Sequence, residues 1–478
     1  MEKSFFLSKK LFGILVGILA FGFFFGCQND LLQTENTNDM GTLKSAKTAN
    51  FMVISKSETL TDDLEQSLTK FGTIVKTIPQ IGIVVLKTSD PKFVTKVIKL
   101  NDVRSVVRDY KARWLEPENF LPMANPPSIG DDEYFFWAQW GLDAINAPEA
   151  WNAGVTGENA KVFILDNGID AEHPDLAPNL NTSLCASFVP EEDWNIQPGF
   201  YFNHGTHVAG IIAAADNLAT DPNAGVIGVA PHAEIVAVKV LSEYDGSGDF
   251  SWIIAGMVYA ANSGANVINM SLGATFARNG FYIDENGELQ KVPASDIQEI
   301  IIASQRAVNY AIKKGAVVVA SAGNGGSNFD GNAFMYKLPA ELNNVIAVSA
   351  IAPNYWATDY INGIDPFLDI PASYTDFGRS LVDIAAPGGD DDFYPQPNWY
   401  YDMVLSTISD GWGFAAGTSM AAPHVAGVAA LIIAKNGGDI TPQEVEKQLL
   451  KTADQIDGNG KSLFFGKGRV NAYRAVTE

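Results

Sequence analysis

The feature that most restricts the fold is a series of short apolar runs that alternate with helical patterns after residue 130. Runs such as AKVFILD, EIVAVKVL, ANVINMSLG and AVVVASAGN consist largely of Val, Ile and Ala, and segments such as SWIIAGMVYAANSG and IIASQRAVNYAIKKG have helical character. Strands that are apolar throughout are buried on both faces, which is typical of a parallel sheet covered by helices. The pattern predicts an α/β fold with a mostly parallel sheet.

Five polar residues fall where these strands end or where the helices begin. Asp166 ends AKVFILD, Ser271 follows ANVINM and Asn324 ends AVVVASAGN, while His204 and Ser419 each open a helix. In parallel sheets, ligands bind in the crevice beyond the carboxyl ends of the strands. We therefore expect all five residues to lie together along the carboxyl ends of the strands.

These residue types match the requirements for attack on an amide carbonyl. That reaction needs a nucleophile, a base, a group that orients the base, and donors for the developing oxyanion. Ser419 stands at a helix start, where free N–H groups favour nearby negative charge. A simpler interpretation is that Ser419, in GTSMAAPHVAG, only caps a buried helix. The two interpretations are compatible, since one residue can begin a helix and present a hydroxyl.

Three motifs then resemble those of the subtilisin-family serine endopeptidases (subtilases). "DNGI", "HGTHVAG" and "GTSMAAPHVAG" occur in the Asp, His, Ser order of that family, and the resemblance covers roughly residues 130–478. It implies a three-layer catalytic domain without a catalytic cofactor. It also implies that Asp166 orients His204, that His204 is the general base and acid, and that Ser419 is the nucleophile. Asn324 would donate to the oxyanion. Asn167 departs from the Ser or Thr usual after the aspartate.

The resemblance extends to residues that would contact substrate. NMSLG resembles the edge strand that pairs with an extended substrate, and it supplies Ser271, Leu272 and Gly273. Leu338-Pro339-Ala340 resembles the specificity-pocket turn, which has a cis peptide before proline. Lys337 would then lie at the pocket floor and favour an acidic residue before the scissile bond. The alternative is that Lys337 is an ordinary surface lysine.

A structural calcium site is a further expectation from the resemblance. Asp132 and Asp175 match positions where the family holds Ca²⁺ with oxygen ligands, and Asn223 or Asp221 would contribute from the following loop. The alternative is that these acids are caps or surface residues. A zinc site at His204 and His207 is disfavoured, since no HExxH pattern or further His and Cys cluster accompanies them.

The N-terminal segment predicts export. Lys9 and Lys10 precede fifteen apolar residues, 11–25, a core too short for a comfortable membrane span. The Gly before Cys27 resembles a lipoprotein processing site, which would lipidate Cys27. An ordinary cleaved signal is the alternative. Cys185 is the one other cysteine, so no disulfide framework is expected.

Residues 50–115 predict a separate small domain with the order β-α-β-β-α-β, in which Thr61 begins the first helix and VRSVVRDYKARWL is the closing strand. This domain resembles the inhibitory propeptide of subtilases, and we expect self-processing between Leu115 and Glu118. The predicted domains are a signal peptide (1–26), a tether (28–49), a propeptide (50–115), a linker (116–130) and a catalytic domain (131–478).

The net charge of the chain restricts the classes of molecule that it is expected to bind. With 55 acidic and 32 basic residues, the formal net charge is −23, which disfavours nucleic acid because phosphate binding requires clustered Lys and Arg. We expect polypeptide substrates, the chain's own propeptide as inhibitor, membrane contact through a lipid anchor only, and an extracytoplasmic location. Two rivals remain: a catalytically silent subtilase fold used for binding, and a serine esterase of another α/β type. The lack of a GxSxG elbow disfavours the esterase.

Overall fold

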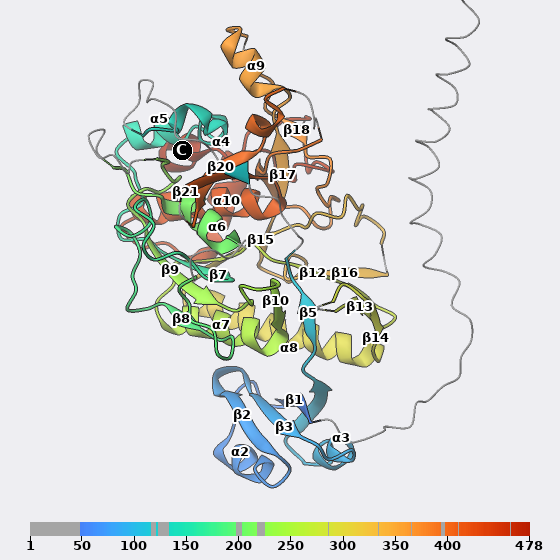
Figure 1. Ribbon diagram of the computed structural model, residues 1–478. Coiled ribbons are helices and arrows are strands. Elements are labelled where there is room, and N and C mark those ends of the chain that lie inside the picture. The colour runs from blue at the N-terminus through green and yellow to red at the C-terminus, as the bar shows by residue number, and fades with distance from the viewer. Residues whose placement is uncertain are drawn as a thin grey trace, which may run out of the picture. The chain divides into compact units, whose positions relative to one another are not determined.

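A computed structural model describes five sheets, and the two that matter most for the site, a small one and a large one, come from different parts of the chain (Figure 1). The described residues are 48–115, 121–122, 133–196, 203–217, 225–284, 286–332, 334–364, 366–392, 397–409, 411–458 and 460–478. The predicted signal peptide, Cys27, most of the tether and linker, Asp132, Asp221 and Asn223 lie outside these residues. Predictions about them therefore stay predictions.

The small sheet has the predicted β-α-β-β-α-β order. Its elements are β1 (Ala49–Ser55), α2 (Asp62–Leu68), β2 (Thr73–Ile78), β3 (Ile83–Thr88), α3 (Phe93–Val97) and β4 (Val103–Arg108). The strands are antiparallel in the spatial order β2-β3-β1-β4. Thr61 caps α2 by accepting a hydrogen bond from the Leu64 amide, as Thr does at helix starts. Alternate residues serve two cores: Val53 packs under α2 and α3, and Ile54 joins the core beneath the larger domain.

The segment expected as one closing strand, VRSVVRDYKARWL, is two strands instead. β4 ends at Arg108, and β5 (Lys111–Arg113) leaves the small sheet to pair with β10 (Ser247–Asp249). The break falls at Asp109, whose carboxylate accepts hydrogen bonds from the Ser251 hydroxyl at 2.6 Å and the Ser251 amide at 3.3 Å. Ser251 lies in the first turn of a helix, where amides lack partners within the helix. The bonds between Asp109 and this helix start therefore account for the change in chain direction at this point.

The large sheet is mostly parallel, as predicted. Its order is β18-β17-β15-β11-β7-β9-β8, with β19 also paired to β17, and only β18 runs antiparallel among the pairs described. The strands are β7 (Lys161–Asp166), β8 (Ala186–Ser187), β9 (Glu234–Lys239), β11 (Val267–Met270), β15 (Val317–Ser321), β17 (Ile346–Ala352), β18 (Ile370–Pro371) and β19 (Ile384–Pro387).

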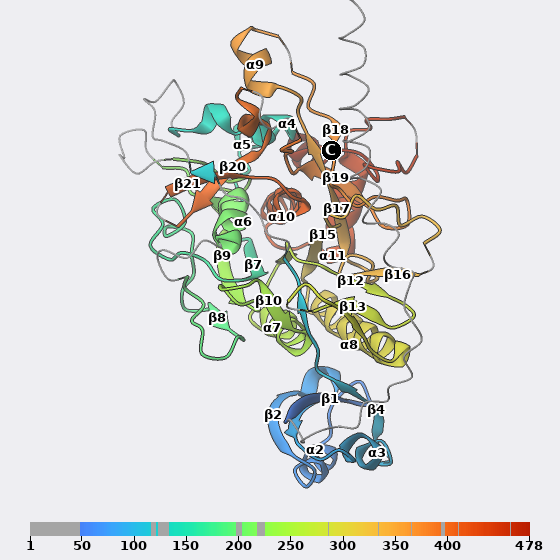
Figure 2. The ribbon, with the colours of Figure 1, turned by 45° about the vertical axis from the view of Figure 1, so that its right-hand side comes forward.

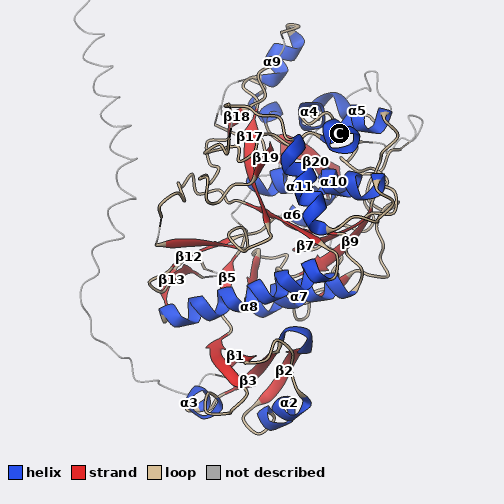
Figure 3. Cartoon of the chain, turned by 180° about the vertical axis from the view of Figure 1, so that it is seen from behind, coloured by secondary structure: helices blue, strands red, loops and turns tan. Residues whose placement is uncertain are grey.

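Helices cover both faces of this sheet. On β7, Val162 and Ile164 pack toward α6 (His204–Ala213) and α10 (Thr418–Lys435), whereas Phe163 and Leu165 pack toward α7 (Phe250–Asn262) and α8 (Ala294–Lys313). Figures 2 and 3 show α6 and α10 on one side and α7 and α8 on the other, where they lie beside the small sheet. This is the predicted three-layer arrangement.

α10 is the central core helix. It is the one helix among the described residues that is long and apolar enough to cross a membrane, but 89% of its apolar window is buried inside the fold. It packs against α6 and against β11, β15, β17 and β19. Because the helix is buried from Thr418 to Ile433, its first residues are held in place relative to the strand ends.

Shorter elements complete the domain around these layers. They are β6 (Leu121–Pro122), α4 (Trp140–Ala144), α5 (Ala147–Asn152), β12 (Ala274–Ala277), β13 (Phe281–Ile283), β14 (Leu289–Lys291), β16 (Met335–Leu338), α9 (Trp356–Ile361), β20 (Val404–Ile408), β21 (Gly411–Ala415), α11 (Pro442–Thr452) and α12 (Ala472–Thr477), with short 3₁₀ turns at Pro79–Ile81, Phe136–Ala138 and Trp399–Asp402.

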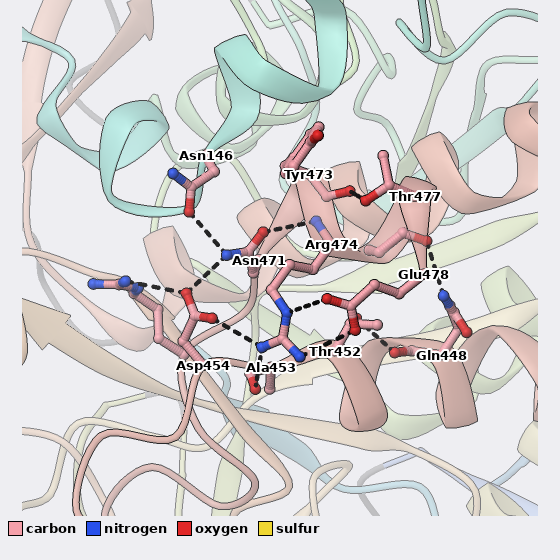
Figure 4. Close-up of polar contacts among 12 residues, drawn as sticks. Asn146, Gln448, Thr452, Ala453, Asp454, Asn471, Tyr473, Arg474, Thr477 and Glu478 are labelled. Carbon is pink, nitrogen blue, oxygen red and sulfur yellow. Dashed lines mark hydrogen bonds and ion pairs between the residues drawn. The ribbon is translucent and has the colours of Figure 1, made fainter. Parts of the chain in front are cut away.

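The C-terminal segment is tied to the start of the domain by a polar network (Figure 4). Asn471 donates to the side-chain oxygen of Asn146 and to Asp454, each at 2.8 Å. Arg474 pairs with Asp454 at 3.0 Å and with Glu478 at 2.8 Å. The network joins α12 to the residue before α5, so residues far apart in sequence close the domain together.

Candidate active site

Asp166 and His204 form a buried pair at the carboxyl ends of the parallel strands. Nδ1 of His204 lies 2.8 and 2.9 Å from the two carboxylate oxygens of Asp166, and the side chains are 0% and 1% exposed. A carboxylate at Nδ1 fixes the imidazole so that its Nε2 can accept a proton. Asp166 is the last residue of β7 and His204 the first of α6. The strand end and the helix start therefore set their distance.

Asn167, the departure from the family pattern, reinforces this junction. Its side-chain oxygen accepts a hydrogen bond from the Gly205 amide at 2.9 Å, and its own amide donates to Asp166 at 2.8 Å. Gly205 must lack a side chain, because a Cβ there would collide with the carbonyl oxygen of Gly168. Asn167 thus keeps a hydrogen-bonding role, and Gly205 permits the close approach of α6.

Ser419 lies in the first turn of α10 and is 6% exposed. Its hydroxyl donates to the carbonyl oxygen of Ser271 at 3.2 Å, and the Ser271 hydroxyl donates to the carbonyl oxygen of Ser419 at 2.7 Å. Asn269 in turn donates to the Ser271 hydroxyl at 3.0 Å. This reciprocal contact joins the helix start to the segment after β11, as the predicted common edge requires.

The Asn324 side chain is oriented by Thr418. Its oxygen accepts hydrogen bonds from the Thr418 amide at 2.9 Å and the Thr418 hydroxyl at 2.7 Å. The Thr418 hydroxyl also accepts a hydrogen bond from the Gly323 amide at 3.0 Å. With its oxygen bound on that side, the amide of Asn324 points its NH₂ group elsewhere. Sequence reasoning missed Thr418, although it sits beside the predicted nucleophile.

Residues 111–114, which follow the small sheet, contact the segment after β11 that also holds Ser271. β5 pairs with β10, and the Gly273 amide donates to the carbonyl oxygen of Trp114 at 2.9 Å. The Trp114 indole donates to the carbonyl oxygen of Gly248 at 2.8 Å and packs against Phe250 with ring centroids 4.8 Å apart. β11 itself lies between β15 and β7, so only the segment after it, through Gly273, contacts the chain that follows the small sheet.

Beyond residues 116–120 the chain pairs with a second strand. Leu121 and Pro122 form β6, which runs antiparallel to β21 opposite Phe414 and Gly413. β21 ends at Ala415, and α10 begins at Thr418. The segment thus has backbone pairing before residue 116 and after residue 120, and Ser419 follows closely after the second pairing strand.

Lys337 is buried, so the surface alternative is wrong. It is 7% exposed, and its ammonium pairs with Asp376 at 3.1 Å and donates to the Thr275 hydroxyl at 3.1 Å. The peptide Leu338–Pro339 is cis, as predicted. Asp376 is a neighbour that sequence reasoning missed, because thirty-nine positions separate it from Lys337 and no local pattern marks it.

The candidate calcium site is only partly described. Asp175 is fully buried, and its carboxylate accepts hydrogen bonds from Val226, Asn217 and Trp412. Glu133, which sequence reasoning missed, has one oxygen bound to the Asn217 amide, and its buried Oε2 lacks a hydrogen-bond partner. Burial, with Asp175 and Asp216 nearby, raises the pKa of Glu133 to about 8. Within the described ranges, no group of three or more His, Cys, Asp or Glu is arranged to hold a metal.

Two other histidines serve packing. His207 is fully buried, with Nε2 3.1–3.2 Å from the carbonyl oxygens of Gly413 and Val404, and burial lowers its pKa to about 3. His424 bonds to the Met420 carbonyl, and burial lowers its pKa to about 4. The His207 ring thus joins α6 to β20 and β21, and the His424 ring bonds within α10. They give no support to a zinc site.

A carboxylate on an imidazole at a sheet edge, with a serine at the start of a packed helix, is an arrangement typical of serine hydrolases. Comparison with known proteins agrees. The pattern of the Subtilase family matches residues 157–468. This chain is 36% identical to Thermitase from Thermoactinomyces vulgaris, over 72% of this chain and 98% of that protein. It is 34% identical to Thermophilic serine proteinase from Bacillus sp. (strain AK1), over 84% of this chain and 83% of that protein.

The fold comparison points the same way. The crystal structure of Epidermin Leader Peptide Processing Serine Protease from Staphylococcus aureus has a TM-score of 0.69 at 24% identity, and the match covers 90% of this chain and 98% of that one. This likeness concerns the fold. The sequence matches show that the chain belongs to the subtilase family. It is a subtilisin-like serine protease, a hydrolase whose substrates are polypeptides.

Proposed function

We propose that Asp166, His204 and Ser419 form the catalytic triad of a serine endopeptidase. The Ser419 hydroxyl attacks the scissile carbonyl carbon while His204 takes its proton through Nε2, and Asp166 holds Nδ1–H and stabilises the imidazolium. The C–N bond then breaks, and the proton passes from His204 to the leaving amine. Water hydrolyses the acyl-enzyme by the same route. The bidentate contact between Asp166 and His204 carries this proposal.

The oxyanion of the tetrahedral intermediate would be held by two donors. The NH₂ group of Asn324 is one, since its oxygen is already engaged by Thr418. The backbone amide of Ser419, in the first turn of α10, is the other. Fixed donors stabilise developing charge without reorganising during the reaction. Catalysis needs no cofactor in this scheme.

Residues 50–115 are proposed to be an inhibitory propeptide that the enzyme removes from itself. Its support is the strand pairing of β5 with β10, the bond from Gly273 to Trp114, and the pairing of β6 with β21. An extended chain bound on both sides of a short segment is the geometry of a substrate. The cut is expected between Leu115 and Glu118.

The N-terminal sequence supports an exported and lipid-anchored enzyme. A basic pair before residues 11–25, followed by Gly26 and Cys27, predicts a signal of the lipoprotein type. The mature protein would then be extracytoplasmic, with Cys27 lipidated and residues 28–49 as a tether. Labelling with radioactive palmitate in cells would mark the wild type and leave Cys27→Ser unmarked.

A structural calcium ion is proposed near Glu133 and Asp175. The orphaned oxygen of Glu133 and the neighbouring carboxylates suit a hard cation, and the residues fit the oxygen chemistry that calcium prefers. Asp132 and Asn223 are the predicted partners. Such an ion would neutralise buried acids and stabilise the domain, and it would have no part in the peptide-bond chemistry.

Self-processing provides the test of the proposed function. We expect purified wild type to lack residues before the 115–118 region and to cleave a peptide library, while Ser419→Ala keeps its full length and cleaves nothing. Ser406→Ala, which removes a buried serine hydroxyl outside the proposed triad, is the matched control and should process normally. An unprocessed, inactive wild type would contradict the proposal and favour a catalytically silent fold.

A further inference from the structure

Segments 271–273 and 323–324 flank Ser419. They define where the side chain of the substrate residue before the scissile bond would lie. The Ser419 hydroxyl contacts the carbonyl of Ser271, and Thr418 is bonded to Gly323 and Asn324. Consider a substrate residue whose scissile carbonyl lies at Ser419 and Asn324. The side chain of that residue would be directed between segment 271–273 and segment 323–324. This step rests on the proposed function, since it assumes attack by Ser419.

Lys337 and Asp376 lie at the end of that space. A Cβ built on Gly273 would be 3.2 Å from Cε of Lys337, and one built on Gly323 would collide with the Lys337 ammonium and the Asp376 carboxylate. The side chain of Lys337 thus passes against both glycines that flank the space. No larger residue fits at Gly323, whose φ is +113° and whose Cα faces the ion pair.

The ion pair is held rigidly on both sides. The side chains of Lys337 and Asp376 are 9% and 2% exposed, and their charged atoms are 3.1 Å apart. The second oxygen of Asp376 accepts hydrogen bonds from the Gly325 amide at 3.1 Å and the Ser327 amide at 2.9 Å. The Asp376 amide donates to the Gly323 carbonyl at 2.8 Å. Asp376 is thereby fixed to the same loop that carries Asn324.

We propose that the Lys337–Asp376 ion pair closes the subsite for the residue before the scissile bond and makes the enzyme select uncharged side chains there. A carboxylate entering the subsite would be attracted by Lys337 and repelled by Asp376, and a substrate ammonium would meet the reverse. Either charge would lose hydration without a net opposite charge to replace it. Lys337 alone would predict an acidic preference, and Asp376 removes that preference.

The test uses fluorogenic peptides that differ only at the residue before the scissile bond. Wild type should have higher kcat/KM for Gln than for Glu, and for norleucine than for Lys. K337M leaves Asp376 unpaired and should raise the Lys-to-norleucine ratio at least about tenfold, whereas D376N should raise the Glu-to-Gln ratio by a similar factor. The double variant K337M/D376N should return both ratios toward wild type.

The controls separate charge in the subsite from general damage. Lys461 pairs with Asp383 at the same 3.1 Å distance but is about a third exposed, so K461M should leave both ratios unchanged. A ratio of kcat/KM values for two peptides does not depend on the fraction of enzyme that is folded. If K337M or D376N fails to accumulate, K337Q or D376S takes its place. Unmoved ratios, or ratios that move in the same direction in both single variants, would overturn the inference. A wild type that cleaves no peptide would instead contradict the proposed function.

Discussion

Replacing Thr418 by valine should impair catalysis through Asn324 while leaving the nucleophile in place. Valine has nearly the shape of threonine but lacks the hydroxyl, and Thr418 is 1% exposed, so its hydroxyl bonds are shielded from bulk water. The change removes a 2.7 Å bond to the Asn324 oxygen and a 3.0 Å bond from the Gly323 amide. The 2.9 Å bond from the Thr418 amide remains. The amide of Asn324 thus loses one of its two restraints.

The magnitude follows from these bonds. A typical hydrogen bond contributes about 1 kcal/mol, and a buried amide left unpaired costs about 1–3 kcal/mol, so we expect T418V to lower the free energy of unfolding by about 2–4 kcal/mol. Complete loss of one oxyanion donor costs roughly 10²–10³ in kcat, a figure measured on a subtilisin and therefore borrowed from this family. Because T418V loosens the donor without deleting it, kcat should fall about 5–50-fold, with KM changed less than about twofold.

Steady-state kinetics on one peptide, with active-site titration, measures both constants. T418S keeps the hydroxyl and should retain most of the wild-type kcat. N324A should show the full loss, and T418V/N324A should be no slower than N324A alone, because Thr418 acts through Asn324. Wild-type kcat in T418V, or independent losses that add in the double variant, would refute the assigned role of Thr418.

Two further predictions concern the propeptide and the metal. Burial against Ser251 raises the pKa of Asp109 to about 6, partly offset by the hydrogen bonds from Ser251 and the charge of Lys76. A raised carboxyl pKa adds stability that is complete below the ordinary value and is lost as pH rises through about 6. The propeptide should therefore bind the mature domain more tightly at pH 4 than at pH 7, and D109N should flatten that dependence in inhibition assays. A D109N curve that matches wild type would contradict this. Chelation of calcium should lower Tm in the wild type and have little effect in E133Q, with about 2.7 kcal/mol expected when the ion is at a hundred times its Kd. Equal shifts in wild type and E133Q, measured by differential scanning fluorimetry, would remove Glu133 from the site.

The sequence predicted those parts of the site that lie inside regular elements. Asp166 and Asn324 come next to apolar runs, and parallel strands bring such ends to one edge. The subtilase resemblance then assigned roles, and the structure places Asp166 against His204 and Ser419 against Ser271. The order of the small domain was also readable, because its apolar alternation and the Thr61 cap are local signals.

What the sequence did not predict depends on contacts between distant segments. Asp376 has no periodic or motif signal, and its pairing with Lys337 exists only because β16 and the segment after β18 meet in the fold. The division of VRSVVRDYKARWL into two strands depends on Ser251, which lies over a hundred residues away. Glu133 stands beside the predicted Asp132, but only its burial distinguishes it as a candidate ligand.

Peptide-bond cleavage by this protein depends, in our proposal, on Ser419 as the nucleophile, activated by His204. Covalent labelling of the mature enzyme with a fluorophosphonate, followed by mass spectrometry of the modified peptide, tests it most directly. We expect one adduct, on Ser419, which is absent from Ser419→Ala and forms far more slowly in His204→Ala. An adduct on another serine, or an active protease that never reacts with the probe, would contradict it.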